Sequence, residues 1–97
     1  MDFEQSKLNE IFRDIQDDCF ELFQEKNKRY DSSFFKQLAE DDDLTSIPVR
    51  LSDKLNRIKS LVKGVEASDD ESLEDTLTDL ANYSVMALTY IRLKRGE

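Results

Sequence analysis

The sequence predicts an all-α fold, a helical bundle of three long helices and one short helix. Two observations lead to this prediction. Only two glycines and one proline interrupt the 97 residues, and apolar residues recur at spacings of three and four, which is the period of an amphipathic helix. No segment shows the alternating pattern of a half-buried strand. The length suits one small domain, so we expect residues 1–97 to form a single domain.

The first long helix is expected over about residues 3–27. Asp2 and Gln5 suggest its N-terminal cap. Cys19 lies on its apolar face, where we expect inert core packing, because the lone cysteine of the chain cannot form an internal disulfide. The apolar face consists of Leu8, Ile11, Phe12, Ile15, Cys19, Leu22 and Phe23.

A short helix and a second long helix are expected next. Residues 30–33 are predicted to form a loop, and Phe34, Phe35 and Leu38 suggest a short helical turn that inserts aromatic side chains into the core. Ser46, with Pro48 just inside, marks the start of the second long helix, and Gly64 marks its end. The apolar face of this helix consists of Leu51, Leu55, Ile58, Leu61 and Val62.

A third long helix follows, which Ser68 and Glu71 open with a predicted capping box and which we expect to end near residues 94–96. Its second half is apolar almost all round, so we expect neighbours on every side. Asp75 and Asp79 would then point toward a region covered by protein, where an unpaired charge is costly. A bound divalent cation is the leading candidate to compensate them. One face of the helix carries Asp75, Asp79, Asn82 and Met86, and the opposite face carries Leu73, Leu77, Leu80, Ser84, Ala87 and Ile91.

The composition limits the function further. The net charge of −8 and the isoelectric point near 4.5 argue against general affinity for nucleic-acid backbones or anionic membranes. The chain has no histidine, which excludes zinc sites and histidine-based catalysis but leaves Mg²⁺ or Mn²⁺ open, since these ions prefer oxygen ligands. Neither a signal peptide nor a membrane-spanning stretch is visible, so we expect a cytoplasmic protein. A small, highly charged helical chain often gains stability by forming oligomers.

The second long helix carries a stripe of positive charge. Arg50, Lys54 and Arg57 are spaced four and three residues apart, and we call these three residues the cationic stripe. Asp53 lies beside them. Carboxylates on one helix for a metal and cations on another for phosphates are the groups that phosphoryl chemistry needs. The alternative is a solvated helix face with ordinary ion pairs.

A further candidate element lies where the first long helix ends. Lys28 and Tyr30 place a basic group beside an aromatic ring, which could hold a base and its phosphates. Alternatively, the cations complement the helix dipole and Tyr30 packs on the core. Asn82 in the third helix could orient a ligand by hydrogen bonding or could satisfy a buried contact between helices.

Three segments together resemble a known family. They read ELFQEKNKRYDSSF, VRLSDKLNRIKSLV and DESLEDTLTDLANYSVMAL, and they occur in the order and spacing of the phage and bacterial nucleotide-modification-associated domain. That domain is similar to MazG and the dimeric dUTPases of the all-α NTP pyrophosphatase superfamily. The resemblance covers roughly residues 18–91. It implies a MazG-like helical bundle that assembles as a dimer or tetramer.

Catalytic members of the superfamily hold magnesium with a Glu-x-x-Glu pair on one helix and a Glu-x-x-Asp pair on the next. The resemblance implies that Asp79 is the aspartate of the second pair, although Thr76 stands where its partner is expected and Asp75 could substitute. Asp53 could match the second acid of the first pair, but Arg50 stands three residues before it. Fewer carboxylates should weaken metal binding, because magnesium affinity depends on ligand charge and placement.

Three functions are compatible with these residues. The first is a metal-dependent pyrophosphohydrolase of a (deoxy)nucleoside triphosphate. The second is a nucleotide-binding protein without catalysis, which sequesters a nucleotide or serves a modification pathway. The third is an acidic helical inhibitor from a phage that binds a host protein. For the first function the metal ligands and catalytic acids are Asp53, Asp75 and Asp79, and the substrate-binding residues are Lys28, Tyr30, Arg50, Lys54, Arg57 and Asn82.

The cell would be a bacterium or a phage-infected host. The apolar residues 85–91 favour a homo-oligomer with its site at the interface.

Overall fold

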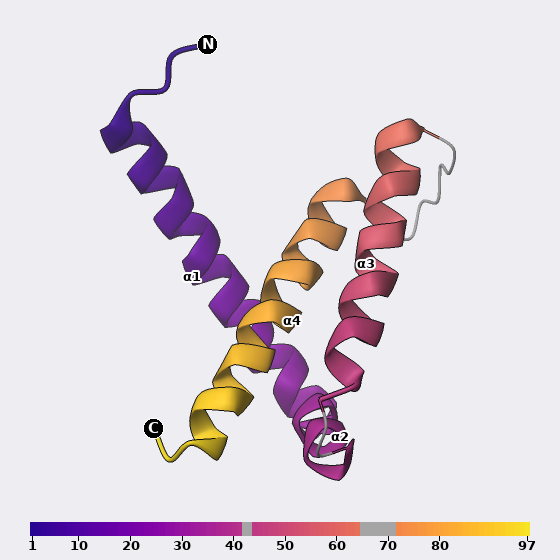
Figure 1. Cartoon of the computed structure of the whole chain (residues 1–97). Helices are drawn as coiled ribbons and strands as arrows, with labels where there is room; N and C mark the ends of the chain where they lie inside the picture. Colours follow the sequence, from indigo (N-terminus) through magenta and orange to yellow (C-terminus); the bar gives the residue numbers. More distant parts are fainter. Residues whose placement is uncertain (42–43, 65–71) are drawn as a thin grey trace. The chain divides into compact units, whose positions relative to one another are not determined.

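A computed structural model describes residues 1–41, 44–64 and 72–97, and these residues form four helices (Figure 1). In chain order they are α1 (Gln5–Arg29), α2 (Ser33–Asp41), α3 (Ser46–Lys63) and α4 (Leu73–Lys94). Strands are absent from this described part of the chain, which confirms the all-α prediction of three long helices and one short helix. The chain divides into two compact units, Met1–Asp31 and Ser32–Glu97. The prediction of a single domain stays a prediction.

The N-terminal unit consists of helix α1 and its flanking residues. The predicted cap at Asp2 and Gln5 is wrong, because Glu4 is the N-cap residue and its carboxylate accepts a hydrogen bond from the backbone N–H of Ser6. The helix ends at Arg29, two residues later than predicted. No residue of α1 is fully buried. Cys19, which was expected in the core, is half-buried. On the apolar face of α1, four residues in the first half of the helix are exposed: Leu8, Ile11, Phe12 and Ile15.

The C-terminal unit is built around the pair α3 and α4, which run antiparallel and pack along each other, while the short α2 contacts both (Figure 1). Helix α3 begins at Ser46 as predicted, with Thr45 as its N-cap residue. Gly64 ends it in the left-handed conformation with a φ of 69°, which confirms the predicted stop. A residue without a Cβ atom adopts this conformation at little cost.

Helix α4 begins later than the sequence suggested. Its N-cap residue is Ser72, whose Oγ accepts a hydrogen bond from the backbone N–H of Asp75 at 3.0 Å. The carboxylate of Asp75 accepts in turn from the backbone N–H of Ser72 at 3.4 Å, which completes a capping box. The predicted cap residues Ser68 and Glu71 lie outside the described residues. A helix that starts at Leu73 is shorter at its N-terminus than the predicted one.

The core of the C-terminal unit is small and lies where α2 meets α3 and α4. Leu38 is fully buried, and Phe34 and Ala87 are nearly so. The ring of Phe34 meets that of Tyr83 edge to face, with 5.1 Å between the centroids. Such aromatic pairs add to the gain from burial alone. Helix α2 therefore inserts an aromatic side chain into the core, as the sequence predicted.

One side of α4 is exposed, although its apolar composition predicted neighbours all round. Leu77, Val85 and Leu88 keep about half of their surface or more in solvent, at 48%, 61% and 46%. The buried side of the helix carries Thr76 and Ala87. The packing of this one chain therefore accounts for only part of the apolar surface of α4. None of the described helices combines the length and the hydropathy needed to cross a membrane.

Candidate phosphate site between α3 and α4

An ion pair joins the two long helices of the C-terminal unit. Nζ of Lys54 on α3 lies 3.1 Å from Oδ2 of Asp79 on α4, and the two side chains expose 23% and 20% of their surface. The sequence predicted that Asp79 points toward a covered region and that another group compensates its charge. In the structure Asp79 is partly covered and ion-paired. A lysine ammonium from the facing helix supplies that compensation in the structure, whereas a divalent cation was the leading candidate.

The other two residues of the cationic stripe lie on either side of Lys54 along α3. Arg57 is half-buried, and its Nε atom is shielded from solvent. Arg50 is exposed, and its Nη2 atom donates a hydrogen bond to Oε1 of Gln37 on α2 at 3.3 Å. The cationic stripe thus runs from the contact with α2 to the contact with α4. Anions can approach at the exposed end, while packing restrains the other two cations.

The three predicted metal ligands do not share one position. Asp75 is exposed and takes part in the capping box with Ser72, and Asp53 is exposed on α3. Among the described residues, no three acidic, cysteine or histidine side chains gather closely enough to hold a metal ion. The structure therefore does not bring the three predicted ligands together, and the magnesium site that the sequence suggested stays a prediction. Asp75 has a structural role at the start of α4 instead, because a negative charge in the first turn stabilises a helix without any ligand.

Thr76 occupies the position where the resemblance expects an acidic partner for Asp79. Its side chain is fully buried, with an exposed fraction of 0%. The hydroxyl donates to the carbonyl oxygen of Ser72 at 2.8 Å, so the polar atom is satisfied within the helix. A carboxylate at this position would be placed inside the packed side of α4 rather than at a ligand site.

The remaining predicted residues lie in different parts of the chain. Asn82 is half-buried on α4, three residues after Asp79. Lys28 and Tyr30 belong to the N-terminal unit, at the end of α1, and both are exposed. The guanidinium of Arg29 lies 6.0 Å from the centre of the Tyr30 ring. Tyr30 is therefore not packed in a core, and a contribution of this element to the site stays a prediction.

The sequence analysis missed the structural roles of two residues, Ser72 and Thr76. Ser72 and Asp75 carry the same capping signature as Ser68 and Glu71, and the signature closer to the apolar run is the one that caps α4. Thr76 gave no signal as a buried residue, because threonine is common on exposed helix surfaces. Its burial follows from the way α4 packs on its neighbours.

The fold and the site define a small all-α protein in which Lys54, the middle residue of the cationic stripe on α3, is ion-paired to Asp79 on α4. A family model described as nucleotide modification associated domain 1 matches residues 26–93. This range includes α2, α3 and nearly all of α4, and it spans more than two thirds of the 97 residues. The chain therefore belongs to the nucleotide modification associated domain 1 family. No curated protein and no solved structure matches it.

Proposed function

We propose that this chain binds a nucleotide, and that the cationic stripe of α3 contacts the phosphates. The ion pair of Lys54 with Asp79 is the observation that most supports this, because it restrains an ammonium group at a half-buried position between two helices. Arg57, one turn further along α3, adds a second half-buried cation. Restrained cations bind phosphate oxygens well, since less side-chain freedom is lost on binding.

The family description also supports this proposal, because it connects the domain with nucleotide modification. We propose that the chain serves a nucleotide-modification pathway in the cytoplasm of a bacterium or a phage-infected host. We also propose that its family is MazG-like and belongs to the all-α NTP pyrophosphatase superfamily. The four-helix content and the absence of strands among the described residues agree with that assignment.

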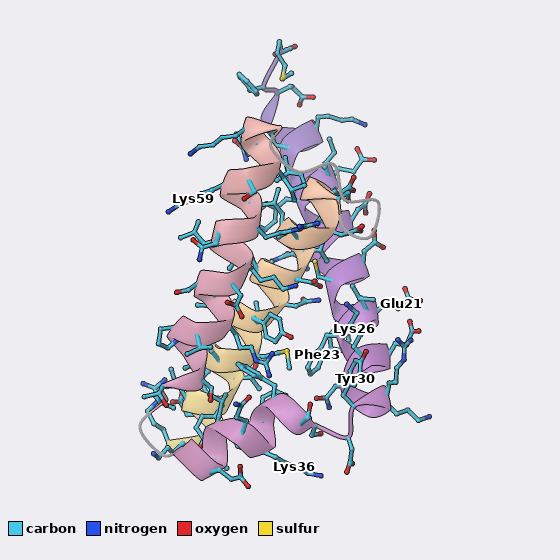
Figure 2. All side chains as sticks on the ribbon, turned by 90° about the vertical axis from the view of Figure 1, so that its right-hand side faces the viewer. Glu21, Phe23, Lys26, Tyr30, Lys36 and Lys59 are labelled. Atoms are coloured by element: carbon cyan, nitrogen blue, oxygen red, sulfur yellow. The ribbon has the colours of Figure 1, made fainter. Side chains whose placement is uncertain are left out.

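The first prediction concerns Lys54. Lys54→Met should weaken the binding of a nucleoside triphosphate by about tenfold to a hundredfold, because a charge-assisted hydrogen bond to phosphate is lost. The measurement is isothermal titration calorimetry with a panel of ribo- and deoxynucleoside triphosphates. Lys59→Met is the matched control, since Lys59 is exposed on the same helix and points away from α4 (Figure 2). Absence of binding across the panel for the unmodified protein would contradict the proposal.

Metal-dependent hydrolysis of the bound triphosphate to monophosphate and pyrophosphate is the second candidate. The half-buried carboxylate of Asp79 beside the cationic stripe favours it, because phosphoryl chemistry combines these two kinds of group. Incubation of the same panel with Mg²⁺ or Mn²⁺, followed by mass spectrometry of the products, separates the candidates. Monophosphate that Asp79→Ala abolishes would establish hydrolysis, and an intact panel would leave binding as the function.

A further inference from the structure

The pairing of Lys54 with Asp79 also bears on how the proposed nucleotide site works. The two residues are separated by 25 positions in the sequence, and the packing of α3 against α4 brings their charged atoms to 3.1 Å. Each side chain exposes less than a quarter of its surface. At this degree of burial an ion pair is screened less by water and salt than a pair on the open surface.

Asp79 could act in two ways at such a site. As a metal ligand it would need further oxygen ligands around the same ion, because magnesium demands octahedral geometry. The other acid on the same face of α4, Asp75, is exposed and hydrogen-bonded to the backbone at the start of the helix. A divalent ion at Asp79 would also stand close to the ammonium of Lys54, and like charges repel. The second way is that Asp79 acts through Lys54, its ion-pair partner. The described surroundings of Asp79 favour this second way.

We infer that Asp79 is a positioning residue, which holds the ammonium of Lys54 for the phosphates of the nucleotide, and that binding needs no divalent metal ion. The inference rests on the proposed function. An ammonium group has several N–H donors, so it can bind a carboxylate and a phosphate oxygen together. The long, flexible stem of lysine loses rotamer freedom when its end is fixed, and an ion pair made before binding removes part of that cost from the binding step.

A double-mutant cycle on nucleotide affinity tests this inference. The variants are Lys54→Met, Asp79→Asn and the double variant, and the probe is the triphosphate of the panel that binds the unmodified protein best. Asp79→Asn should weaken binding about threefold to tenfold when Lys54 is present, because the ammonium is no longer held. In the Lys54→Met background the same substitution should cause no further loss, since there is no ammonium left to position. Glu74→Gln is the matched control, because it removes one carboxylate from an exposed position on the same helix.

The opposite result of the cycle would overturn the inference. A loss on Asp79→Asn that has the same size with and without Lys54 would mean that Asp79 contacts the nucleotide or its metal directly. Each variant is first checked for helix content by circular dichroism. Asp79→Glu provides a rescue arm for the case in which Asp79→Asn does not fold, because it keeps the charge and should retain most of the affinity.

A second measurement needs no variant. The unmodified protein should bind the triphosphate in EDTA at least as tightly as in Mg²⁺, because free triphosphate carries more negative charge for the cationic stripe. Binding that occurs only with Mg²⁺ would overturn the inference while leaving nucleotide binding in place. Absence of binding under both conditions would reject the proposed function itself, so the two failures are distinguishable.

Discussion

At the scale of single residues, Thr76 marks a difference between this chain and the catalytic proteins that it resembles. Those proteins carry an acidic residue at this position, as the first member of a Glu-x-x-Asp pair. The Thr76 hydroxyl donates a hydrogen bond to the carbonyl oxygen of Ser72, the N-cap residue of α4, and the side chain has no exposed surface. The position can therefore accept a small side chain but not a solvated charge. A metal ligand at Thr76 would require a different arrangement of the elements that cover it.

This leads to a prediction for stability. Thr76→Glu should lower the free energy of unfolding by about 3 kcal/mol or more, because it buries a carboxylate without a built partner. Urea denaturation followed by circular dichroism measures the change. Thr76→Val is the control, since it keeps the shape and loses one hydrogen bond, at a cost of about 1 kcal/mol. Equal stability of Thr76→Glu and the unmodified protein would contradict the buried position.

The ion pair between Lys54 and Asp79 could not be predicted at the residue scale. The sequence identified both residues as candidates and predicted that Asp79 needs compensation. It did not indicate which group supplies it, because the pair depends on the register of α3 against α4 across 25 positions of sequence. Local patterns give spacing within one helix, whereas contacts between helices depend on how their faces interlock.

At the scale of the helices, the helical spacing of apolar residues predicted each of the four described helices and most of the length of each. The start of α4 was the largest error, because two serines four residues apart each precede an acid by three positions. Such signatures are equivalent when read one at a time. The structure resolves the choice in favour of Ser72, which makes both hydrogen bonds of a capping box with Asp75.

The cap of α4 gives a prediction at this scale. Ser72→Ala should lower the free energy of unfolding by about 1 kcal/mol, because the backbone N–H of Asp75 loses its side-chain acceptor. Chemical denaturation of the two proteins measures the difference. Ser84→Ala is the control, since Ser84 is exposed within the same helix and alanine is the better helix former there. A loss at Ser84 as large as that at Ser72 would show that capping is not the cause.

At the scale of the whole molecule, the exposed apolar residues of α4 support the expected homo-oligomer. Leu88→Asp should lower the oligomer order, because it places a charge on that exposed apolar side, where Leu88 is 46% accessible. Light scattering coupled to size-exclusion chromatography measures the mass. Asn56→Asp, an exposed and nearly isosteric change on α3, is the control. A folded Leu88→Asp variant of unchanged mass would count against an interface on this side of α4.

The edge-to-face contact between Phe34 and Tyr83 has a spectroscopic consequence. The chain contains no tryptophan and three tyrosines, so its near-ultraviolet circular dichroism comes chiefly from tyrosine. Tyr30 is exposed, whereas the Tyr83 ring is held at 5.1 Å from that of Phe34. An immobilised ring in an asymmetric environment gives the stronger signal. The tyrosine band should therefore report in part the docking of α2 on α4, and it should weaken in Phe34→Ala while the helical far-ultraviolet signal of α1 remains. Tyr90, which is half-buried on α4, should keep its contribution.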